Sequence, residues 1–313
     1  MLKGVYTYDI PEALQASLKN VELIRITEDP ASYEHFPHAE DIQLLIARQG
    51  AVNRMLQSFP NVRWLQLLNA GFEKVDLQLL KERHILFTNA RSVYCNTIAE
   101  DVMAKLLILS RKYMVHFAQQ EQHFWPDDAQ LPNWNLDLSG KRLLILGAGF
   151  IGKNIAVRAK AFGMYVTGYD PYVTAQEGFD TVGSDLPGAL RQADFVVTSL
   201  PVTPETRDII NEKTLAMMKP TAHIINVARG EIVDEQALCH ALHAGTIAGA
   251  AIDVAKQEPL PADSPLWSAP NLLITPHRAA YGDQMRQRMC ALIARNIIHY
   301  QNGEPLEDTV SLS

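Results

Sequence analysis

The stretch Leu143–Asp170, LLILGAGFIGKNIAVRAKAFGMYVTGYD, decides the fold. An apolar run typical of a buried strand leads into Gly147, Gly149 and Gly152 at GxGxxG spacing, and a helix-forming segment and a second apolar run follow. A strand, a glycine loop and a helix in this order form the first half of a dinucleotide-binding unit. There the first glycine permits a tight turn, the second lets the backbone approach a pyrophosphate, and the third lets the helix pack closely against the strand.

The same stretch predicts which groups would hold a dinucleotide. Backbone N–H groups near Phe150 and Ile151 would face the phosphates at the positive end of the predicted helix. Asp170 lies 23 residues after Gly147 (170 − 147 = 23), where a carboxylate accepts hydrogen bonds from ribose hydroxyls. Because this carboxylate would repel the 2′-phosphate of NADP, we expect NAD as cofactor. The alternative is a glycine turn without a ligand, and the register of strand, loop, helix and acid argues against it.

Alternating strand and helix patterns fill both halves of the chain and predict an α/β protein with parallel sheets. We expect two doubly wound domains with a cleft between them: a flavodoxin-like substrate domain (1–96 and 285–313) and a Rossmann cofactor domain (97–284). One amphipathic helix is predicted over 97–122, with Thr97 as its cap and Glu100 completing a capping box. The predicted strands are 21–26, 42–47, 62–68 and 84–89, then 142–146, 165–170, 194–200, 223–228, 248–254 and 271–275.

Composition excludes several classes of function. The 313 residues contain 28 Lys and Arg against 35 Asp and Glu, a net charge of −7, which argues against a nucleic-acid or anionic-membrane surface. No apolar run reaches the length of a membrane span, and no secretory signal is expected at the N-terminus. Cys95, Cys239 and Cys290 are widely spaced and form no metal-binding pattern, so we expect reduced thiols, no metal and a cytoplasmic protein.

Three predicted strands are each followed by a polar group suited to one reaction. Arg229 follows 223–228, Glu258 lies in the loop after 248–254, and His277 follows 271–275. Ligands of doubly wound sheets bind beyond the carboxyl ends of the strands, so these side chains would face the nicotinamide. Singly, each has a simpler interpretation: a surface ion pair, a solvated carboxylate or a strand-end histidine. Their occurrence at consecutive strand ends after a dinucleotide loop favours a catalytic set.

The reduction of a 2-keto acid requires this combination. A hydride goes to the carbonyl carbon and a proton to its oxygen, and a histidine is the natural proton donor near neutral pH. Glu258 would hold the imidazole of His277 in its protonated form. A planar arginine such as Arg229 can grip the substrate carboxylate with two hydrogen bonds and polarise the carbonyl. Asp253 has two open interpretations, a contact with the nicotinamide amide or a partner for nearby backbone N–H groups.

These motifs resemble those of the D-isomer-specific 2-hydroxyacid dehydrogenases. The match runs through nearly the whole chain and is densest from 141 to 277. In order, the matching signatures are GAGFIG (147–152), LPVTPETRDIIN (200–211), MKPTAHIINVARGEIVDEQAL (218–238), AIDVAKQEPLPADSPLW (251–267) and TPH (275–277).

The resemblance implies roles for further residues. Arg229, Glu258 and His277 match the family's catalytic set, and LLNAGFEKVD (67–76) resembles its substrate loop, where N–H groups of Ala70 and Gly71 would hold the substrate carboxylate. The family is typically homodimeric, and the loop with Trp125 and Trp134 is a plausible part of that contact. The implied cofactor contacts are Thr97, Pro201, Thr206, Ala228 and Asp253.

Several departures leave the substrate open. Arg278 follows His277 where the family has a small or apolar residue, and it would either point away or bring a second cation to the substrate, with Tyr281 close behind. Arg48 roughly matches an arginine that binds a second anionic group in some relatives, with a solvated arginine as the alternative.

We therefore expect a hydride-transferring oxidoreductase acting with NAD(H) on a small 2-keto or 2-hydroxy acid of the glyoxylate/hydroxypyruvate type. Glu258 disfavours formate dehydrogenase, which has a glutamine at the matching position. The alternatives are an NADH-linked, corepressor-like binding protein of the same fold and a phosphite-type dehydrogenase.

Overall fold

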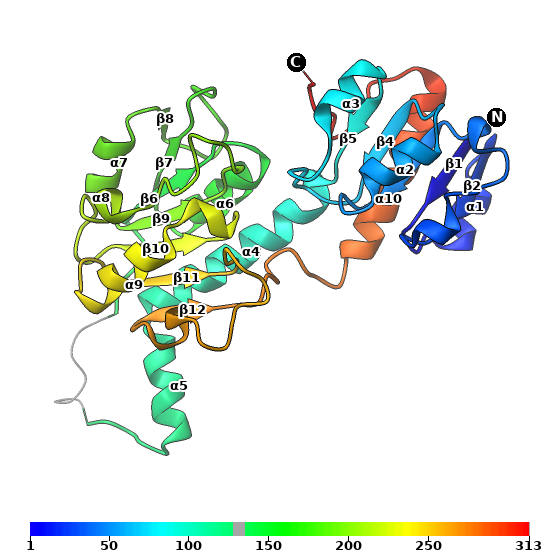
Figure 1. The fold of residues 1–313 in the computed structure, drawn as a ribbon. Coiled ribbons are helices and arrows are strands. Elements are labelled where there is room, and N and C mark those ends of the chain that lie inside the picture. Colours follow the sequence, from blue (N-terminus) through cyan, green and yellow to red (C-terminus); the bar gives the residue numbers. More distant parts are fainter. Residues whose placement is uncertain (128–134, 313) are drawn as a thin grey trace. The chain divides into compact units, whose positions relative to one another are not determined.

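The computed structural model describes residues 1–127 and 135–312 and divides into two compact units. Unit 1 consists of Met1–Tyr94 and Gly282–Ser313, and unit 2 of Cys95–Tyr281. Each unit is built on one sheet of parallel strands (Figure 1). The helix α4 (Arg91–Ser110) starts in unit 1 and continues in unit 2.

The sheet of unit 1 has five parallel strands in the order β2-β1-β3-β4-β5. This is the flavodoxin-type order, as the sequence predicted. The strands are β1 (Leu2–Tyr6), β2 (Val21–Arg25), β3 (Leu44–Ala47), β4 (Trp64–Leu67) and β5 (Leu86–Thr88). The helices are α1 (Glu12–Ser17), α2 (Val52–Ser58), α3 (Leu77–Glu82) and α10 (Met285–Asn302).

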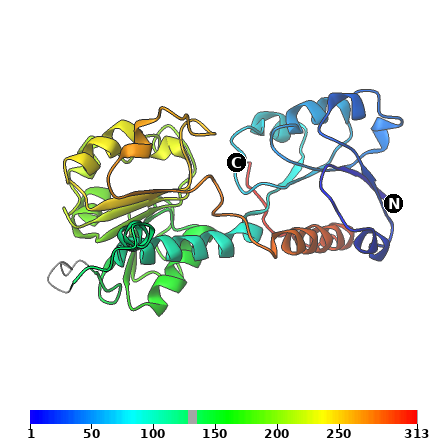
Figure 2. The same cartoon turned by 90° about the horizontal axis from the view of Figure 1, so that it is seen from below.

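Helices cover both faces of this sheet because alternate side chains of its strands point to opposite sides. In β3, Leu44 and Ile46 pack in a core with residues of α10, whereas Leu45 and Ala47 pack in a second core with residues of α2. Figure 2 shows α10 on one side of the sheet and α2 on the other. Because both faces of the sheet are buried at β3, the sequence of this strand is a continuous apolar run and does not alternate between apolar and polar residues.

The sheet of unit 2 has seven parallel strands in the order β12-β11-β10-β9-β6-β7-β8. The first strand in the sequence, β6, lies inside the sheet, and the later strands are added on both sides of it. This is the doubly wound arrangement. The strands are β6 (Arg142–Leu146), β7 (Tyr165–Tyr169), β8 (Thr181–Gly183), β9 (Phe195–Thr198), β10 (His223–Asn226), β11 (Gly249–Ile252) and β12 (Leu272–Ile274).

Helices α7 and α9 pack on one face of this sheet, with a core that includes Leu190 and Leu238. Helix α4 runs along the opposite face (Figure 2) and buries Val102 and Leu106. The helices of unit 2 that follow α4, including α7 and α9, are α5 (Tyr113–Glu121), α6 (Phe150–Ala161), α7 (Leu186–Gln192), α8 (Glu212–Leu215) and α9 (Glu235–His243).

Two strands were not predicted from the sequence. Strand β1 contains Lys3 and Gly4, and therefore lacks the unbroken apolar run of its neighbour β3. Strand β8 is a three-residue edge strand with no buried residue. The sequence predicted four strands in the first part and six in the second, whereas the sheets contain five and seven.

The predicted helix over 97–122 was wrong in two respects. Helix α4 already begins at Arg91, so Thr97 lies inside it and does not cap it. The Oε1 atom of Glu100 lies 3.6 Å from a terminal guanidinium nitrogen of Arg158 on α6, so Glu100 forms an ion pair instead of completing a capping box. The helix is also interrupted at Lys112, whose left-handed backbone (φ 54°) separates α4 from α5.

Two further observations concern the part of the chain that the structure describes. None of its helices is both long and apolar enough to span a membrane. Cys95, Cys239 and Cys290 are free thiols, and all three are buried.

A buried ion pair fixes the middle of α4. Lys105 is 1% exposed, and its Nζ donates a hydrogen bond to Oδ2 of Asp101, one turn earlier. Burial raises the pKa of the Asp101 carboxyl, and Lys105 opposes that shift. The pair therefore joins a buried ammonium to a carboxylate that is partly exposed.

We expect Lys105→Met to lower the free energy of unfolding by roughly 1 to 3 kcal/mol, because it leaves a partly buried carboxylate without its charged partner. The double variant Lys105→Met/Asp101→Asn removes both charges and should recover most of that loss. Urea denaturation followed by circular dichroism measures both effects. A single variant as stable as the wild type would contradict the structural role of this pair.

Candidate active site

Six neighbouring strands of unit 2 end level with one another. The register pairs the last residues of β7, β6, β9, β10, β11 and β12 in turn: Tyr169, Leu146, Thr198, Asn226, Ile252 and Ile274. The segments that follow these strands, including the first turn of α6, carry every residue of unit 2 that the sequence predicted for the site, except Thr97 on α4. One edge of one sheet therefore gathers the predicted cofactor and catalytic groups.

The glycine loop has the geometry of a phosphate cradle. Gly147 has a left-handed backbone (φ 102°), and a Cβ there would lie 2.9 Å from the carbonyl oxygen of Ser199. A Cβ on Gly152 would lie 2.0 Å from the carbonyl oxygen of Gly147, so the helix can approach the turn only with glycine at this position. Among the described atoms, nothing lies within 4 Å of a Cβ built on Gly149.

Helix α6 begins at Phe150, directly after this loop. Because the N-cap residue is Gly149, it contributes no side-chain oxygen to the first-turn N–H groups. The positive end of the helix, with Phe150 and Ile151 in its first turn, is thus available to an anion. Open space over Gly149 and a helix start that lacks a capping side chain fit the pyrophosphate of a dinucleotide.

Asp170 stands at the end of β7 and binds the glycine loop from the side. Its Oδ2 accepts a hydrogen bond from the N–H of Ala148 at 3.0 Å, and its Oδ1 accepts from Tyr172 and Val173 at 2.9 and 3.1 Å. The carboxylate therefore organises two backbone segments, a role that the sequence did not predict. Any bond to a ribose hydroxyl would use the remaining lone pairs of the same oxygens.

The loop after β9 is held against the glycine loop. Ser199 Oγ donates to the carbonyl oxygens of Leu146 and Gly147, at 3.1 and 3.0 Å. Further along, Thr206 Oγ1 donates to the carbonyl oxygen of Pro201 at 2.6 Å. Pro201 and Thr206, both predicted cofactor contacts, are thus tied to each other in a loop that begins beside the phosphate cradle.

His277 and Glu258 form a direct pair. The Nδ1 of His277 lies 2.7 Å from Oε2 of Glu258, and the two side chains are 47% and 39% exposed, respectively. The other carboxylate oxygen of Glu258 accepts a hydrogen bond from the N–H of Ala255 at 3.1 Å. With Nδ1 occupied by the carboxylate, Nε2 is the ring atom that can exchange a proton with a ligand.

Asp253 shapes the turn that carries His277. Its side chain is buried, and its Oδ1 accepts from Thr275 Oγ1 at 2.5 Å and from the N–H of Arg278 at 2.9 Å. Its Oδ2 accepts from the N–H of Ala279 at 2.8 Å, and its carbonyl oxygen accepts from the N–H of His277 at 2.7 Å. Of the two interpretations of Asp253, these contacts support the role of partner for backbone N–H groups.

Arg229 is positioned by the buried amide of Asn226. The Nδ2 of Asn226 donates to the carbonyl oxygen of Arg229 at 2.9 Å, while its Oδ1 accepts from the N–H of Ala228 at 3.1 Å and from Thr198 Oγ1 at 2.6 Å. The half-buried Arg229 side chain donates through one terminal nitrogen to the carbonyl oxygen of Ala228 at 2.7 Å. Asn226 thereby fixes the backbone at Ala228, a predicted cofactor contact, and at Arg229, the predicted catalytic cation.

Arg278 stacks on Tyr281. Its guanidinium carbon lies 3.9 Å from the centre of the Tyr281 ring, and the N–H of Tyr281 donates to the carbonyl oxygen of Arg278 at 2.9 Å. His277 has a left-handed backbone (φ 53°), so the alternation of an extended strand does not extend through this turn. It is Glu258, not Arg278, that contacts the imidazole.

The remaining predicted residues lie elsewhere in the chain. Thr97 is on α4, where the neighbouring Asn96 accepts a hydrogen bond from Arg158 of α6 at 3.2 Å. Ala70 and Gly71 follow β4 in unit 1, and the carbonyl oxygen of Ala70 accepts from Asn89 at 2.8 Å.

Arg48 is exposed directly after β3, whose end pairs with the end of β4. Its charge acts on Tyr8, in the loop after β1. Burial raises the pKa of the Tyr8 phenol, and the charge of Arg48 opposes part of that rise. Trp125 is exposed, and Trp134 lies outside the described residues.

Sequence reasoning missed three groups that build the site: Ser199, Asn226 and the carboxylate of Glu235. A polar residue within an apolar strand, as in HIIN, signals a buried hydrogen-bonding side chain and could have drawn attention to Asn226. No comparable signal marks Glu235, which accepts a hydrogen bond from the N–H of Lys256 at 2.6 Å.

Comparison with known proteins agrees with this geometry. Residues 103–279, more than half of the chain, match the family model described as D-isomer specific 2-hydroxyacid dehydrogenase, NAD binding domain. The chain is 34% identical over 272 residues to glyoxylate/hydroxypyruvate reductase B of Pectobacterium carotovorum, covering 85% of each protein. It is 31% identical over 318 residues to D-3-phosphoglycerate dehydrogenase of Methanocaldococcus jannaschii, matching along its whole length but spanning only 60% of that relative.

Solved structures give the same result. A D-isomer specific 2-hydroxyacid dehydrogenase family protein from Aeromonas salmonicida superimposes with a TM-score of 0.84 at 32% identity, covering 100% of this chain and 99% of that one. An NADPH-dependent glyoxylate/hydroxypyruvate reductase from Sinorhizobium meliloti, in complex with citrate, gives 0.82 at 26% identity, with coverage of 100% and 98%. The chain belongs to the family of D-isomer-specific 2-hydroxyacid dehydrogenases.

Proposed function

We propose that this protein reduces small 2-keto acids of the glyoxylate/hydroxypyruvate type to D-2-hydroxy acids with NADH. The observation that carries the proposal is the 2.7 Å contact between His277 and Glu258 at the same sheet edge as the glycine loop. A relative from Pectobacterium carotovorum and a solved structure from Sinorhizobium meliloti, both named glyoxylate/hydroxypyruvate reductases, support the substrate class.

In this mechanism His277 is the proton donor. A nicotinamide cofactor, when bound, supplies the hydride for the carbonyl carbon. The carboxylate of Glu258 holds Nδ1 of the imidazolium, which leaves the proton on Nε2 for the carbonyl oxygen. After the transfer, the neutral imidazole remains oriented by the same contact and can be protonated again from solvent, because the ring is half exposed.

Substrate binding is assigned to cations and backbone N–H groups. Arg229 would bind the carboxylate of the keto acid and polarise its carbonyl group. The N–H groups of Ala70 and Gly71 are proposed to bind a substrate carboxylate as well. Arg48 and Arg278 are candidates for a second anionic group on larger substrates.

The predicted cofactor contacts are assigned in the same way. Phosphates would bind at Gly147, Gly149 and Gly152 and at the N–H groups of Phe150 and Ile151. The nicotinamide side would meet Thr97 and Asp253, and Pro201, Thr206 and Ala228 would line the path between them. The open space over Gly149 supports the first of these assignments.

NAD is the proposed cofactor because of the negative charge of Asp170. Some solved structures of the family contain NADPH, among them one from Xanthobacter autotrophicus. In this chain the Asp170 carboxylate is fixed by three backbone N–H groups, so it cannot easily turn away from a 2′-phosphate.

The direct test is a panel of 2-keto acids assayed with NADH and NADPH, following the loss of absorbance at the nicotinamide band. We expect turnover with glyoxylate or hydroxypyruvate and NADH. Binding of NADH without oxidation by any keto acid would favour a corepressor-like binding protein. Reduction of NAD by phosphite, without activity on keto acids, would favour a phosphite dehydrogenase.

His277→Ala should lower kcat by roughly 10²-fold to 10⁴-fold, because the general acid is lost, and should leave the Kd for NADH nearly unchanged. Glu258→Gln should lower kcat less, because the amide oxygen can still accept from Nδ1 of His277 but no longer supplies a counter-charge. His240→Ala, an exposed histidine on α9, is the matched control. Wild-type turnover in His277→Ala would refute the assignment.

Asp170→Asn should raise the ratio of kcat/KM with NADPH to kcat/KM with NADH by about tenfold, because it removes one charge from the ribose site, while one of the two acceptor oxygens remains for the backbone. Steady-state kinetics with both cofactors measure this ratio. An unchanged ratio would mean that Asp170 serves the backbone only.

We also propose a homodimer. Four aromatic side chains on α5 and in the loop after it are exposed between 46% and 93%, an unusual amount of apolar surface for one short segment: Tyr113, Phe117, Phe124 and Trp125. Phe117→Glu should shift the protein from dimer to monomer in light scattering. A wild-type protein that is monomeric at micromolar concentration would contradict the proposal.

A further inference from the structure

We propose that Glu235 is a positioning residue for the pair of Glu258 and His277. It lies at the first position of α9 and touches neither side chain of the pair. It acts through the backbone of Ala255 and Lys256, which leads into the loop of Glu258. The inference rests on the proposed function of that pair as the proton-donating unit.

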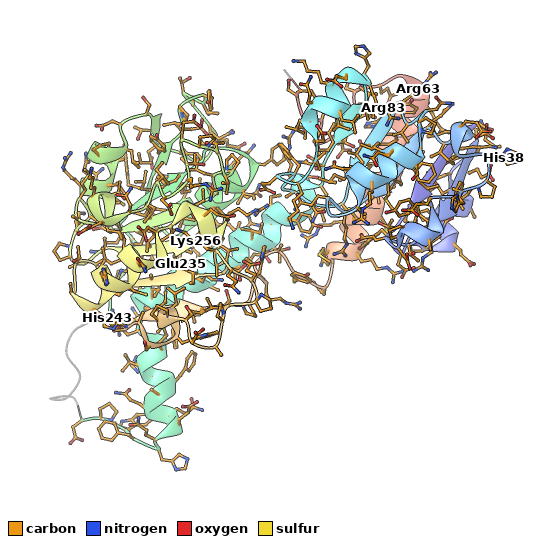
Figure 3. The ribbon with its side chains drawn as sticks, in the orientation of Figure 1. His38, Arg63, Arg83, Glu235, His243 and Lys256 are labelled. Carbon is orange, nitrogen blue, oxygen red and sulfur yellow. The ribbon has the colours of Figure 1, made fainter. Side chains whose placement is uncertain are left out.

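Consecutive N–H groups connect Glu235 to the pair. The N–H of Lys256 donates to Oε1 of Glu235 at 2.6 Å, and the N–H of Ala255 donates to Oε1 of Glu258 at 3.1 Å. The second oxygen of Glu258 then reaches His277 at 2.7 Å. A short, charge-assisted bond from α9 thus fixes the backbone that orients the carboxylate. Figure 3 shows the labelled Glu235 and Lys256 close together.

The same backbone is packed against the turn that follows Arg229. A Cβ built on Gly230 would lie 2.0 Å from the carbonyl carbon of Ala255 and 2.2 Å from the nitrogen of Lys256. Gly230 is therefore in direct contact with the peptide group between these two residues. Holding that peptide group in place holds the loop of Glu258 in register with the turn of Arg229.

Glu235 is available for this role because a different residue caps the helix. Asp234 is the N-cap of α9, and its Oδ1 accepts from the N–H groups of Gln236 and Ala237 at 3.1 and 3.2 Å. The first turn therefore does not need the carboxylate of Glu235, which extends to Lys256. Its negative charge is favourable at the positive end of α9.

The side chain of Lys256 provides a matched control. Its Nζ lies 2.7 Å from Oδ1 of Asp208, and the two side chains are 37% and 41% exposed. Solvent-exposed ion pairs of this kind contribute little to stability. Removing this pair leaves the bond from the Lys256 N–H to Glu235 in place, so it should not disturb Glu258.

Loss of Glu235 should loosen the geometry of the pair and leave the cofactor cradle intact. We expect Glu235→Ala to lower kcat about tenfold, because small displacements of catalytic groups are costly. KM for the keto acid should change less than kcat, because none of the proposed substrate contacts is removed. The Kd for NADH should stay the same.

The experiment compares wild type, Glu235→Ala, Glu235→Gln and Lys256→Met. The amide oxygen of Glu235→Gln can still accept from the Lys256 N–H, so this variant should recover most of kcat. Lys256→Met should behave as wild type. A Glu235→Ala variant with wild-type kcat would overturn the inference. A Glu235→Gln variant that loses as much kcat as Glu235→Ala would also overturn it, since the acceptor oxygen would then not be what positions the pair.

A readout independent of turnover separates this inference from the proposed function. The ring ¹⁵N shifts of His277, assigned by their absence in His277→Ala, are compared at one fixed pH in the same variants. A change of the Nδ1 shift in Glu235→Ala and Glu258→Gln, but not in Lys256→Met, supports the role of Glu235 even if no keto acid is turned over, because Nδ1 is the atom that contacts Glu258. Identical His277 shifts in wild type and Glu235→Ala would refute it.

Discussion

The hydrogen-bond register of one parallel sheet is the constraint on which the candidate site depends. Because β6, β7 and β9 to β12 end at the same level, loops far apart in the sequence open at one edge. A parallel sheet has this property at its carboxyl edge only, since every strand points the same way. A register shift of one residue between β11 and β12 would move one of their loops by about 3.3 Å and break the contact of His277 with Glu258.

Within that frame, backbone contacts do most of the fine positioning. Asp253 holds the turn of His277 through N–H groups, Asn226 holds that of Arg229, and Asp170 holds the glycine loop. Such bonds are short and leave little conformational freedom, so the reactive side chains start from defined backbone positions. They also explain why buried polar residues stand at strand ends in an otherwise apolar sheet.

The sequence was sufficient for the architecture and for the glycine loop before α6. Continuous apolar runs predicted most strands, and the glycine spacing located that loop. Strands without such a run, β1 and β8, were missed, because their pairing comes from tertiary context. The early start of α4 at Arg91 was missed as well, because the local capping signal at Thr97 was outweighed by the residues before it. The role of Glu235 depends on a contact to Lys256 across 21 positions and has no local signature.

The most direct test of the account is the fate of the hydride. Hydroxypyruvate is reduced with NADH that carries deuterium at both C4 positions, and the product is analysed by mass spectrometry and chiral chromatography. The account predicts D-glycerate with one deuterium at C2, formed by the wild type and almost absent with His277→Ala. Glycerate without deuterium at C2, a racemic or L-product, or equal yields from both proteins would contradict it.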